Sequence, residues 1–455
     1  MAGLYLMLAV ILFIIREIVV DEEWWPHTFF CLTSVLIPLL SVKLKCRGDL
    51  NHILYDHRIV FLCGYIFFCV VGASLQVFGG KELVSAQELI YPTNLKKVIF
   101  LDIVNSLGVG LVIFFSSIYT PKFISRLVRS IVQGLRTTSS TVPMYVSGSL
   151  GIGALAYIWL NGTSDEQVIS GFWFLVAKLA LLSIFLGESI DNKQRIPKLF
   201  SKIIVVTHVA IGLAMLNKTN VVFPVAVMFL AKSVKRKSAL SMLIAFASSV
   251  LILSALGAPV LEARAQVAAQ TMTSPLSGLE YLHDYFLSDS SVDTGDEYSL
   301  WSRINYVNVG VAAIDLYDTG RGGEDFDKIL WLFAPRLFFP EKPVITDTGS
   351  IFYTKLTGYE GTSFGMSLFA NGYYNLGFLG VVLVGVAVGL IVTCTSTIAK
   401  EVVRFESFLL YPLVFLGISI GYQVNGAFVS DYLGNFIALA LIGFVLRIAA
   451  AIRLS

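Results

Sequence analysis

The chain has 455 residues, of which 56% are hydrophobic and 14% charged, and its mean hydropathy is +0.76. Soluble globular chains carry about 25% charged residues, so this composition excludes a disordered chain and argues against a soluble one. The formal net charge of +2 gives no overall field that would attract nucleic acid. We therefore expect an all-α polytopic membrane protein.

Apolar segments recur along nearly the whole chain, and a transmembrane helix needs about 20 mostly apolar residues. The seventh and eighth segments are short and are separated only by Asn217-Lys218-Thr219-Asn220, which predicts a tight helical hairpin. The first lacks the basic start and the cleavage site of a signal peptide, so we count it as a span. The twelve expected spans are residues 4–20, 29–42, 59–78, 98–117, 142–160, 167–187, 203–216, 221–231, 239–256, 374–397, 408–422 and 435–451.

Lysine and arginine alternate between the loops in a way that predicts orientation. Loops 43–58, 119–141, 188–202 and 232–238 carry four each, and loop 400–404 and the C-terminal end carry two each. The intervening short loops carry only Lys81, Lys96, Lys97 and Lys218. Since basic residues accumulate in cytoplasmic loops, both termini are expected in the cytoplasm.

The same alternation places one long loop on the outer side and divides the chain into three parts. These are a bundle of about nine spans (1–256), a cap loop (257–373) and a bundle of about three spans (374–455). Residues 257–363 hold fifteen Asp or Glu and seven Lys or Arg. Helical spacing of apolar residues predicts amphipathic helices over 275–287 and 299–317, resting on the bundle or in the outer interface, and a third helical piece over 324–333.

The cap loop carries most of the candidate chemistry. Arginine grips phosphate or carboxylate with two parallel hydrogen bonds, so Arg303, Arg336 and Lys342 are candidates for binding an anionic group. A lone loop arginine would otherwise simply face solvent from the polar side of its helix. Asp315, Asp347 and Glu360 are candidates for a general base, and the sequence does not rank them. Tyr353 is one of several loop aromatics that could stack on a sugar or form the core of the loop.

Few ionisable residues lie inside the expected spans. Lys178 lies near the middle of the sixth, where a charge is costly; it either serves function or pairs with a polar group between helices. Asp102 is expected at the interface, one turn inside the fourth span. The glycines of 148–153 and 385–389 should let helices approach closely rather than bind phosphate. No metal-type spacing of Cys or His, no Walker motif and no disulfide framework is found, so no cofactor and no metal are expected.

The stretch Pro335-Arg336-Leu337-Phe338-Phe339-Pro340-Glu341-Lys342-Pro343 has three prolines in nine residues, which prevent a continuous helix. Together with Arg303 before it, and with the serines of 363–367 and Tyr374-Asn375-Leu376-Gly377 after it, this stretch resembles the end of the large periplasmic loop of Wzy-type O-antigen polymerases. These are the oligosaccharide repeat unit polymerases of bacterial surface polysaccharide assembly. The layout of twelve spans with one dominant outer loop is also similar.

The resemblance implies a GT-C-like membrane glycosyltransferase of the bacterial inner membrane, working in lipopolysaccharide biosynthesis without a cofactor. The donor would be a glycan on undecaprenyl pyrophosphate and the acceptor a repeat unit on the same lipid, with a chain-length regulator and a flippase as possible partners. Arg336, Arg303 and Lys342 would stabilise the leaving pyrophosphate. Substrate contacts are expected from Tyr353, Tyr374, Asn375 and Lys178.

Three other functions remain open on the sequence alone. An O-antigen ligase shares the layout and the donor but uses the lipid A core as acceptor. A lipid-linked oligosaccharide flippase or other transporter would need a polar cavity through the bundle and little outer cap. A structural scaffold would need no arginine or lysine in the cap.

Overall fold

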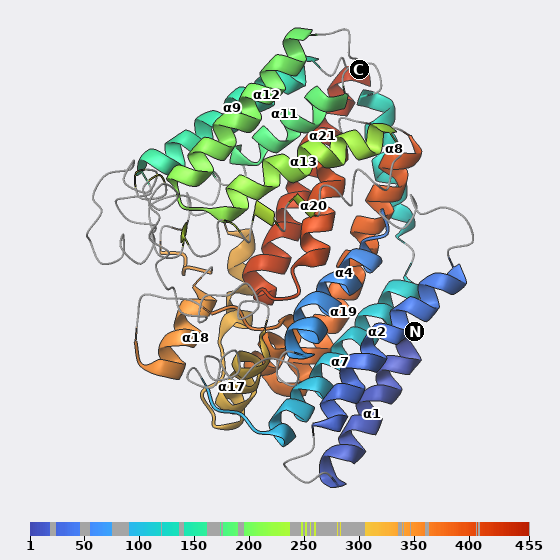
Figure 1. Ribbon diagram of the computed structural model, residues 1–455. Coiled ribbons are helices and arrows are strands. Elements are labelled where there is room, and N and C mark those ends of the chain that lie inside the picture. The colour runs from blue at the N-terminus through green and yellow to red at the C-terminus, as the bar shows by residue number, and fades with distance from the viewer. Residues whose placement is uncertain are drawn as a thin grey trace. The chain divides into compact units, whose positions relative to one another are not determined.

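The computed structural model (Figure 1) describes most of the chain. Every regular element within the described residues is a helix, which confirms the all-α prediction for them. The described residues are 1–18, 24–45, 55–74, 91–119, 121–135, 141–161, 173, 176–189, 195–236, 247–248, 251–252, 255, 259–260, 280, 283, 305–334, 339, 341–345, 347–359, 364–405, 407 and 410–454.

Many of these helices are long and apolar enough to cross a membrane. In the described part of the chain, six meet both criteria: His57–Ser74, Leu95–Ile118, Thr141–Leu160, Arg195–Ala214, Leu368–Arg404 and Phe428–Ile448. Three shorter apolar helices are Leu179–Glu188, Asn220–Phe229 and Leu413–Tyr422. The chain is thus consistent with a helical membrane protein; the count of twelve spans and the GT-C architecture stay predictions.

The chain forms two compact units that cut across the three parts expected from the sequence. The first unit holds residues 1–134, 301–405 and 413–455, so the last part of the long loop belongs with both ends of the chain. The second holds residues 135–300 and 406–412. Each unit is described by itself below.

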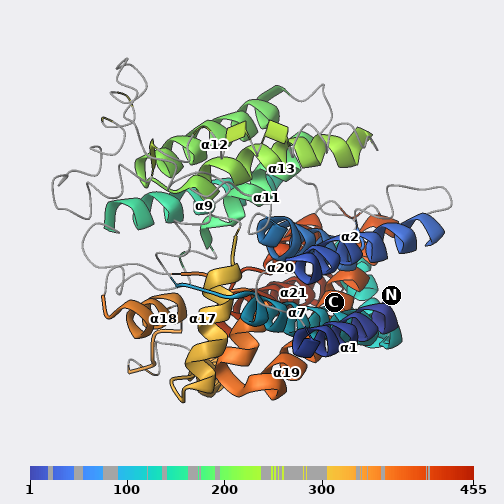
Figure 2. The same cartoon turned by 60° about the horizontal axis from the view of Figure 1, so that its bottom comes forward.

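In the first unit, α7 (Leu95–Ile118) lies at the centre and packs on α1 (Ala2–Ile18), α2 (Trp25–Lys45) and α19 (Leu368–Arg404). Figures 1 and 2 both show α1, α7 and α19 side by side. Glycines allow the close approach: a Cβ on Gly108 would lie 2.2 Å from Phe369 Cδ1, and one on Gly389 would lie 2.9 Å from the Val112 carbonyl oxygen. The predicted packing role of the glycines of 385–389 is confirmed.

The first unit contains further helices before and after α7 in the chain. The segment His57–Ser74 begins as α4 (His57–Tyr65) and continues through the π-helical turn η1 (Ile66–Val71). After α7 comes α8 (Lys122–Leu135), within the basic loop expected at 119–141. The C-terminal part consists of α20 (Tyr411–Tyr422), the π-helical turn η5 (Phe428–Leu433) and α21 (Gly434–Leu454).

Helix α19 is broken near its start. Leu376 and Gly377 leave helical geometry, with φ of −141° and +60°, and Gly377 has ψ of −144°. A Cβ on Gly380 would lie 1.9 Å from the Gly372 carbonyl oxygen, so the two parts of the helix meet almost in backbone contact. The helix begins at Leu368 and its long continuous part follows Gly377, so the tenth span expected over 374–397 lies within α19.

The described part of the long loop is more deeply packed than expected. The amphipathic helix predicted over 299–317 is α17 (Val307–Asp318), which packs on α7 and α19 and therefore rests on the bundle, one of the two expected positions. It is more deeply buried than an amphipathic pattern indicates, with nine of its twelve residues buried, because Gly310, Ala312 and Ala313 let neighbours approach closely. The piece over 324–333 is confirmed as the 3₁₀ helix η3 (Asp325–Phe333). Thr348–Thr357 forms α18. Most of 275–287 lies outside the described residues.

The second unit contains α9 (Thr141–Asn161), α11 (Leu179–Ser189), α12 (Arg195–Ala214) and α13 (Lys218–Arg236). The predicted hairpin is confirmed: α12 and α13 pack on each other across a break of three residues. Leu216 takes a left-handed φ of 50° there, and the Asn217 N–H donates to the Gly212 carbonyl at 2.9 Å. A Cβ on Gly151 would lie 2.2 Å from the Ala180 nitrogen, so α9 and α11 also approach through glycine.

Candidate functional site

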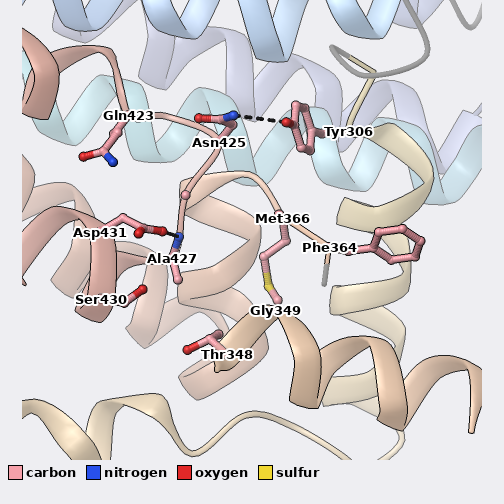
Figure 3. Close-up of a pocket in the computed structure, with 12 residues that line it drawn as sticks. Tyr306, Thr348, Gly349, Phe364, Met366, Gln423, Asn425, Ala427, Ser430 and Asp431 are labelled. Atoms are coloured by element: carbon pink, nitrogen blue, oxygen red, sulfur yellow. Dashed lines mark hydrogen bonds between the residues drawn. The ribbon is translucent and has the colours of Figure 1, made fainter. Parts of the chain in front are cut away.

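A cavity of about 430 Å³ lies in the first unit, where the ends of several apolar helices meet residues of the long loop (Figure 3). One wall is the connection from α20 into η5. The others are the segment before α19, the start of α18 and the residue before α17. The lining residues are Tyr306, Thr348, Gly349, Phe364, Gly365, Met366, Gln423, Asn425, Gly426, Ala427, Ser430 and Asp431.

Backbone hydrogen bonds fix the connection between α20 and η5 against the start of α19. The Leu368 N–H donates to the Val424 carbonyl at 2.8 Å. The Phe428 N–H donates to the Asn371 side-chain oxygen at 3.0 Å, and Asn371 is fully buried. The connection is therefore a fixed part of the fold, and its polar side chains are held in place around the cavity.

Asp431 is the only charged side chain among the described residues that line the cavity. Its Oδ2 accepts the Ala427 N–H at 2.8 Å, the bond drawn in Figure 3. A Cβ on Gly426 would lie 2.6 Å from the same oxygen, so glycine makes room for the carboxylate. Asp431 is half-buried and lies in the π-helical turn η5, a geometry that often occurs at functional sites.

The other polar side chains of the cavity are neutral and are supported by residues around them. The Asn425 amide donates to the Tyr306 hydroxyl at 3.0 Å, also drawn in Figure 3. Gln423 Oε1 accepts from Asn435 Nδ2 at 2.9 Å. Thr348 donates through its hydroxyl to Asp325 Oδ1 at 2.9 Å. Such a set of neutral donors and acceptors suits a ligand rich in hydroxyl groups.

Two residues predicted to contact substrate lie behind the cavity wall. Asn375 joins α19 to η3: its Oδ1 accepts the Asp325 N–H at 2.8 Å and its Nδ2 donates to Asp325 Oδ2 at 3.5 Å. Asp325 in turn accepts from Thr348, which lines the cavity. Tyr374 is 1% exposed and packs edge-on against Phe352, with ring centroids 5.4 Å apart. The two residues support the wall that carries the lining side chains.

Tyr353 lies beside the cavity, and two other predicted loop residues, Asp347 and Lys342, have partners within the loop. The Tyr353 ring meets the ring of Phe364 edge-on at 4.9 Å, and Phe364 lines the cavity. Asp347 precedes α18 and pairs with Lys328 at 3.3 Å. The Lys342 ammonium donates to the Ala334 carbonyl at 3.0 Å.

Asp315 belongs to a separate polar cluster and does not line the cavity. Its Oδ2 accepts from Lys97 Nζ at 2.5 Å and from the Tyr91 hydroxyl at 2.7 Å. Burial, together with the hydrogen bond to Asp315 and its negative charge, raises the pKa of Tyr91 to about 12. The carboxylate of Asp315 is thus occupied by a cation and a phenol.

The remaining predicted residues cannot be compared with the cavity. Arg303, Arg336 and Glu360 lie outside the described residues. Lys178 belongs to the second unit, directly before α11. Their predicted roles stay predictions.

Two ionisable residues have surroundings that the sequence did not indicate. Asp102, expected at the interface, is 1% exposed, and its Oδ2 lies 2.7 Å from Nδ1 of His27, whose Nε2 donates to the Ala73 carbonyl at 3.0 Å. The burial arises because α2 covers this face of α7. Asp431 was overlooked, although the polar stretch between the last two expected spans contains this one acidic residue.

Among the described residues, the cavity combines hydrogen-bonding groups with one carboxylate that could accept a proton. Within the described residues, no group of three or more His, Cys, Asp or Glu side chains could hold a metal ion. In comparisons with protein-family models, with curated proteins and with solved structures, nothing matches this chain.

Proposed function

We propose that this chain polymerises lipid-linked oligosaccharide repeat units at the outer face of a bacterial inner membrane, as an O-antigen polymerase does. The observation that carries the proposal is the polar cavity with its carboxylate, formed jointly by the long loop and by the ends of apolar helices. A lipid-linked glycan needs this combination, since its lipid lies among the apolar helices and its sugars need polar contacts beside them.

The size and position of the cavity suit a sugar. Binding sites for small molecules have volumes of about 300–1,000 Å³, and this cavity of about 430 Å³ falls in that range. The distribution of basic residues predicts that the end of the bundle with the loop of 423–427 lies outside the cytoplasm. On that orientation, both termini are cytoplasmic and the cavity opens toward the periplasm.

The proposed reaction transfers the growing glycan from undecaprenyl pyrophosphate to the terminal sugar of a new lipid-linked unit. A hydroxyl of that sugar attacks the anomeric carbon of the donor, and undecaprenyl pyrophosphate leaves. Cations aimed at the leaving group stabilise the charge that grows on it, and Arg336, Arg303 and Lys342 are the candidates. The energy comes from the donor bond, so neither a nucleotide nor a metal is required.

Deletion of the gene in its host, followed by gel electrophoresis of the surface lipopolysaccharide, tests this function. Wild-type lipopolysaccharide with chains of different lengths gives a ladder of bands. We expect the deletion to remove this ladder and to leave core plus one repeat unit, because units would be made, flipped and ligated but not joined. Core alone, with repeat units accumulating on the lipid carrier, would contradict the proposal and indicate a ligase or a flippase. An unchanged ladder would refute all three.

Complementation of the deletion then tests the leaving-group role. We expect the Arg336→Ala variant to reach the membrane at the wild-type level and to leave the ladder absent. Arg126→Ala is the matched control, because Arg126 is an exposed residue of α8 outside the cavity. A full ladder from Arg336→Ala would contradict this role of Arg336.

A further inference from the structure

The charges around the cavity restrict which part of a lipid-linked glycan can occupy it. Among the described lining residues there is one carboxylate, on Asp431, and no lysine, arginine or histidine. A pyrophosphate group needs cationic partners and would be repelled by a carboxylate. The cavity therefore suits a sugar ring, whose hydroxyls can donate to Asp431 and exchange hydrogen bonds with the neutral side chains.

We propose that the cavity is the acceptor-sugar subsite of the polymerase and that Asp431 takes the proton of the attacking hydroxyl. This assignment rests on the proposed function. The acceptor oxygen forms a bond to the anomeric carbon of the donor, and the bond from that carbon to the pyrophosphate oxygen breaks with its electron pair leaving on the pyrophosphate. The hydroxyl proton passes to the carboxylate of Asp431, which later releases it to water.

The hydrogen bonds of Asp431 agree with this role. Its Oδ2 accepts one backbone N–H, from Ala427 at 2.8 Å, and its carboxylate also accepts a hydrogen bond from the Ser430 side chain. A carboxylate has about four acceptor positions, so Asp431 can also receive a substrate hydroxyl. The backbone bond fixes the direction of the carboxylate, and the amides of Asn425 and Gln423 are held beside it by Tyr306 and Asn435.

Three other described carboxylates of the loop are engaged elsewhere. Asp315 binds Lys97, and Asp347 pairs with Lys328. Asp325 is 5% exposed and accepts from Thr348 and Asn375, behind the cavity wall. Asp431 is the carboxylate among the described residues that lines the space where a substrate would bind.

Asp431→Asn is the first test because it removes the basic group while the asparagine oxygen can still accept the Ala427 N–H. We expect the ladder to be lost in the deletion strain at a normal membrane level of the variant. With purified protein in lipid nanodiscs and the lipid-linked repeat unit as substrate, the rate of polymerisation should fall about 10²–10⁴-fold, as for loss of a general base. Asp318→Asn is the matched control, because the exposed Asp318 accepts from the Tyr373 hydroxyl outside the cavity; it should retain the ladder.

A binding measurement separates the subsite from the chemistry. The probe is the repeat-unit oligosaccharide without lipid or pyrophosphate, titrated into the protein in nanodiscs. Wild type and Asp431→Asn should bind it within a few-fold of each other, whereas Ser430→Leu, which fills part of the cavity, should bind about tenfold more weakly or worse. Inorganic pyrophosphate should not displace the oligosaccharide.

Each failure has a distinct meaning. A wild-type ladder from Asp431→Asn, in a strain whose deletion abolishes the ladder, overturns the role of Asp431 and leaves the proposed function standing. Displacement of the oligosaccharide by pyrophosphate, or unchanged binding to Ser430→Leu, overturns the acceptor subsite. An intact ladder in the deletion strain itself overturns the proposed function and this assignment together.

Discussion

Replacement of Asp102 by leucine removes one half of a buried polar pair that joins α2 to α7. The side chains of His27 and Asp102 are 0% and 2% exposed, and their polar atoms lie 2.7 Å apart. His27 Nε2 donates to the Ala73 carbonyl, so Nδ1 depends on Asp102 alone for its strong hydrogen bond. Removal of one partner of such a pair costs about 3–5 kcal/mol of stability, because the other is left buried without compensation.

The double replacement His27→Leu/Asp102→Leu should cost clearly less than Asp102→Leu, since neither polar group is then left alone. The assay is unfolding of the purified protein in mixed micelles of detergent and denaturant, followed by loss of helical circular dichroism. Asp318→Asn, at an exposed carboxylate, serves as the control and should change little. If Asp102→Leu unfolds at the same denaturant fraction as the control, the buried pair does not hold α2 on α7. The same conclusion follows if the double variant loses as much stability as Asp102→Leu and His27→Leu lose together.

Two further predictions follow from backbone geometry and from a shifted titration. Gly377→Ala should cost about 1–3 kcal/mol of stability in the same assay, because its φ of +60° and ψ of −144° suit only glycine. Gly443→Ala should be neutral or stabilising, because no atom lies within 4 Å of the added Cβ. Equal effects of the two replacements would disprove the reasoning. Tyr91 has its pKa raised from 10.0 to about 12, so its contribution to stability is complete below pH 10 and lost as pH rises toward 12. An ultraviolet difference titration against Tyr91→Phe checks this, and phenolate formation near pH 10 would contradict it.

Features set by local composition could be predicted from the sequence. The apolar segments are helices where the structure describes them, since a long apolar stretch can satisfy its backbone only within itself in a membrane. The short break at Asn217-Lys218-Thr219-Asn220 marked the hairpin of α12 and α13, because two helices joined by so few residues must pack on each other. Glycine clusters marked close helix contacts for the same local reason: a missing side chain leaves room on one face.

Burial depends on distant parts of the chain and could not be read from local patterns. The spacing of apolar residues in α17 indicates which face is apolar, but α7 and α19, far away in the sequence, cover the rest of the helix. Asp102 looked interfacial from its distance to the end of the span. Its burial depends on a histidine 75 positions away whose contact no periodicity indicates.

The candidate site was missed for a related reason. Its described lining residues come from four separate stretches, at Tyr306, at 348–349, at 364–366 and at 423–431, and none has a recognisable motif. The basic and aromatic residues of the cap stand out in the sequence, because cations suit a pyrophosphate. A neutral sugar site needs amides, hydroxyls and one carboxylate, which are too common in sequences to stand out until the fold brings them together.

The polar residues of the first unit therefore divide by what surrounds them. Asp102, Asp315 and Asp325 have partners that satisfy them inside the protein, and their bonds join helices. A carboxylate held in this way stabilises the fold but gains nothing from meeting a substrate. Asp431 differs because its neighbours fix its direction while the cavity leaves room for a ligand on the other side. Proton transfer requires a carboxylate that is held in position and still has room to bind a substrate. Asp431 meets both conditions, because a backbone hydrogen bond orients it and the cavity lies beside it.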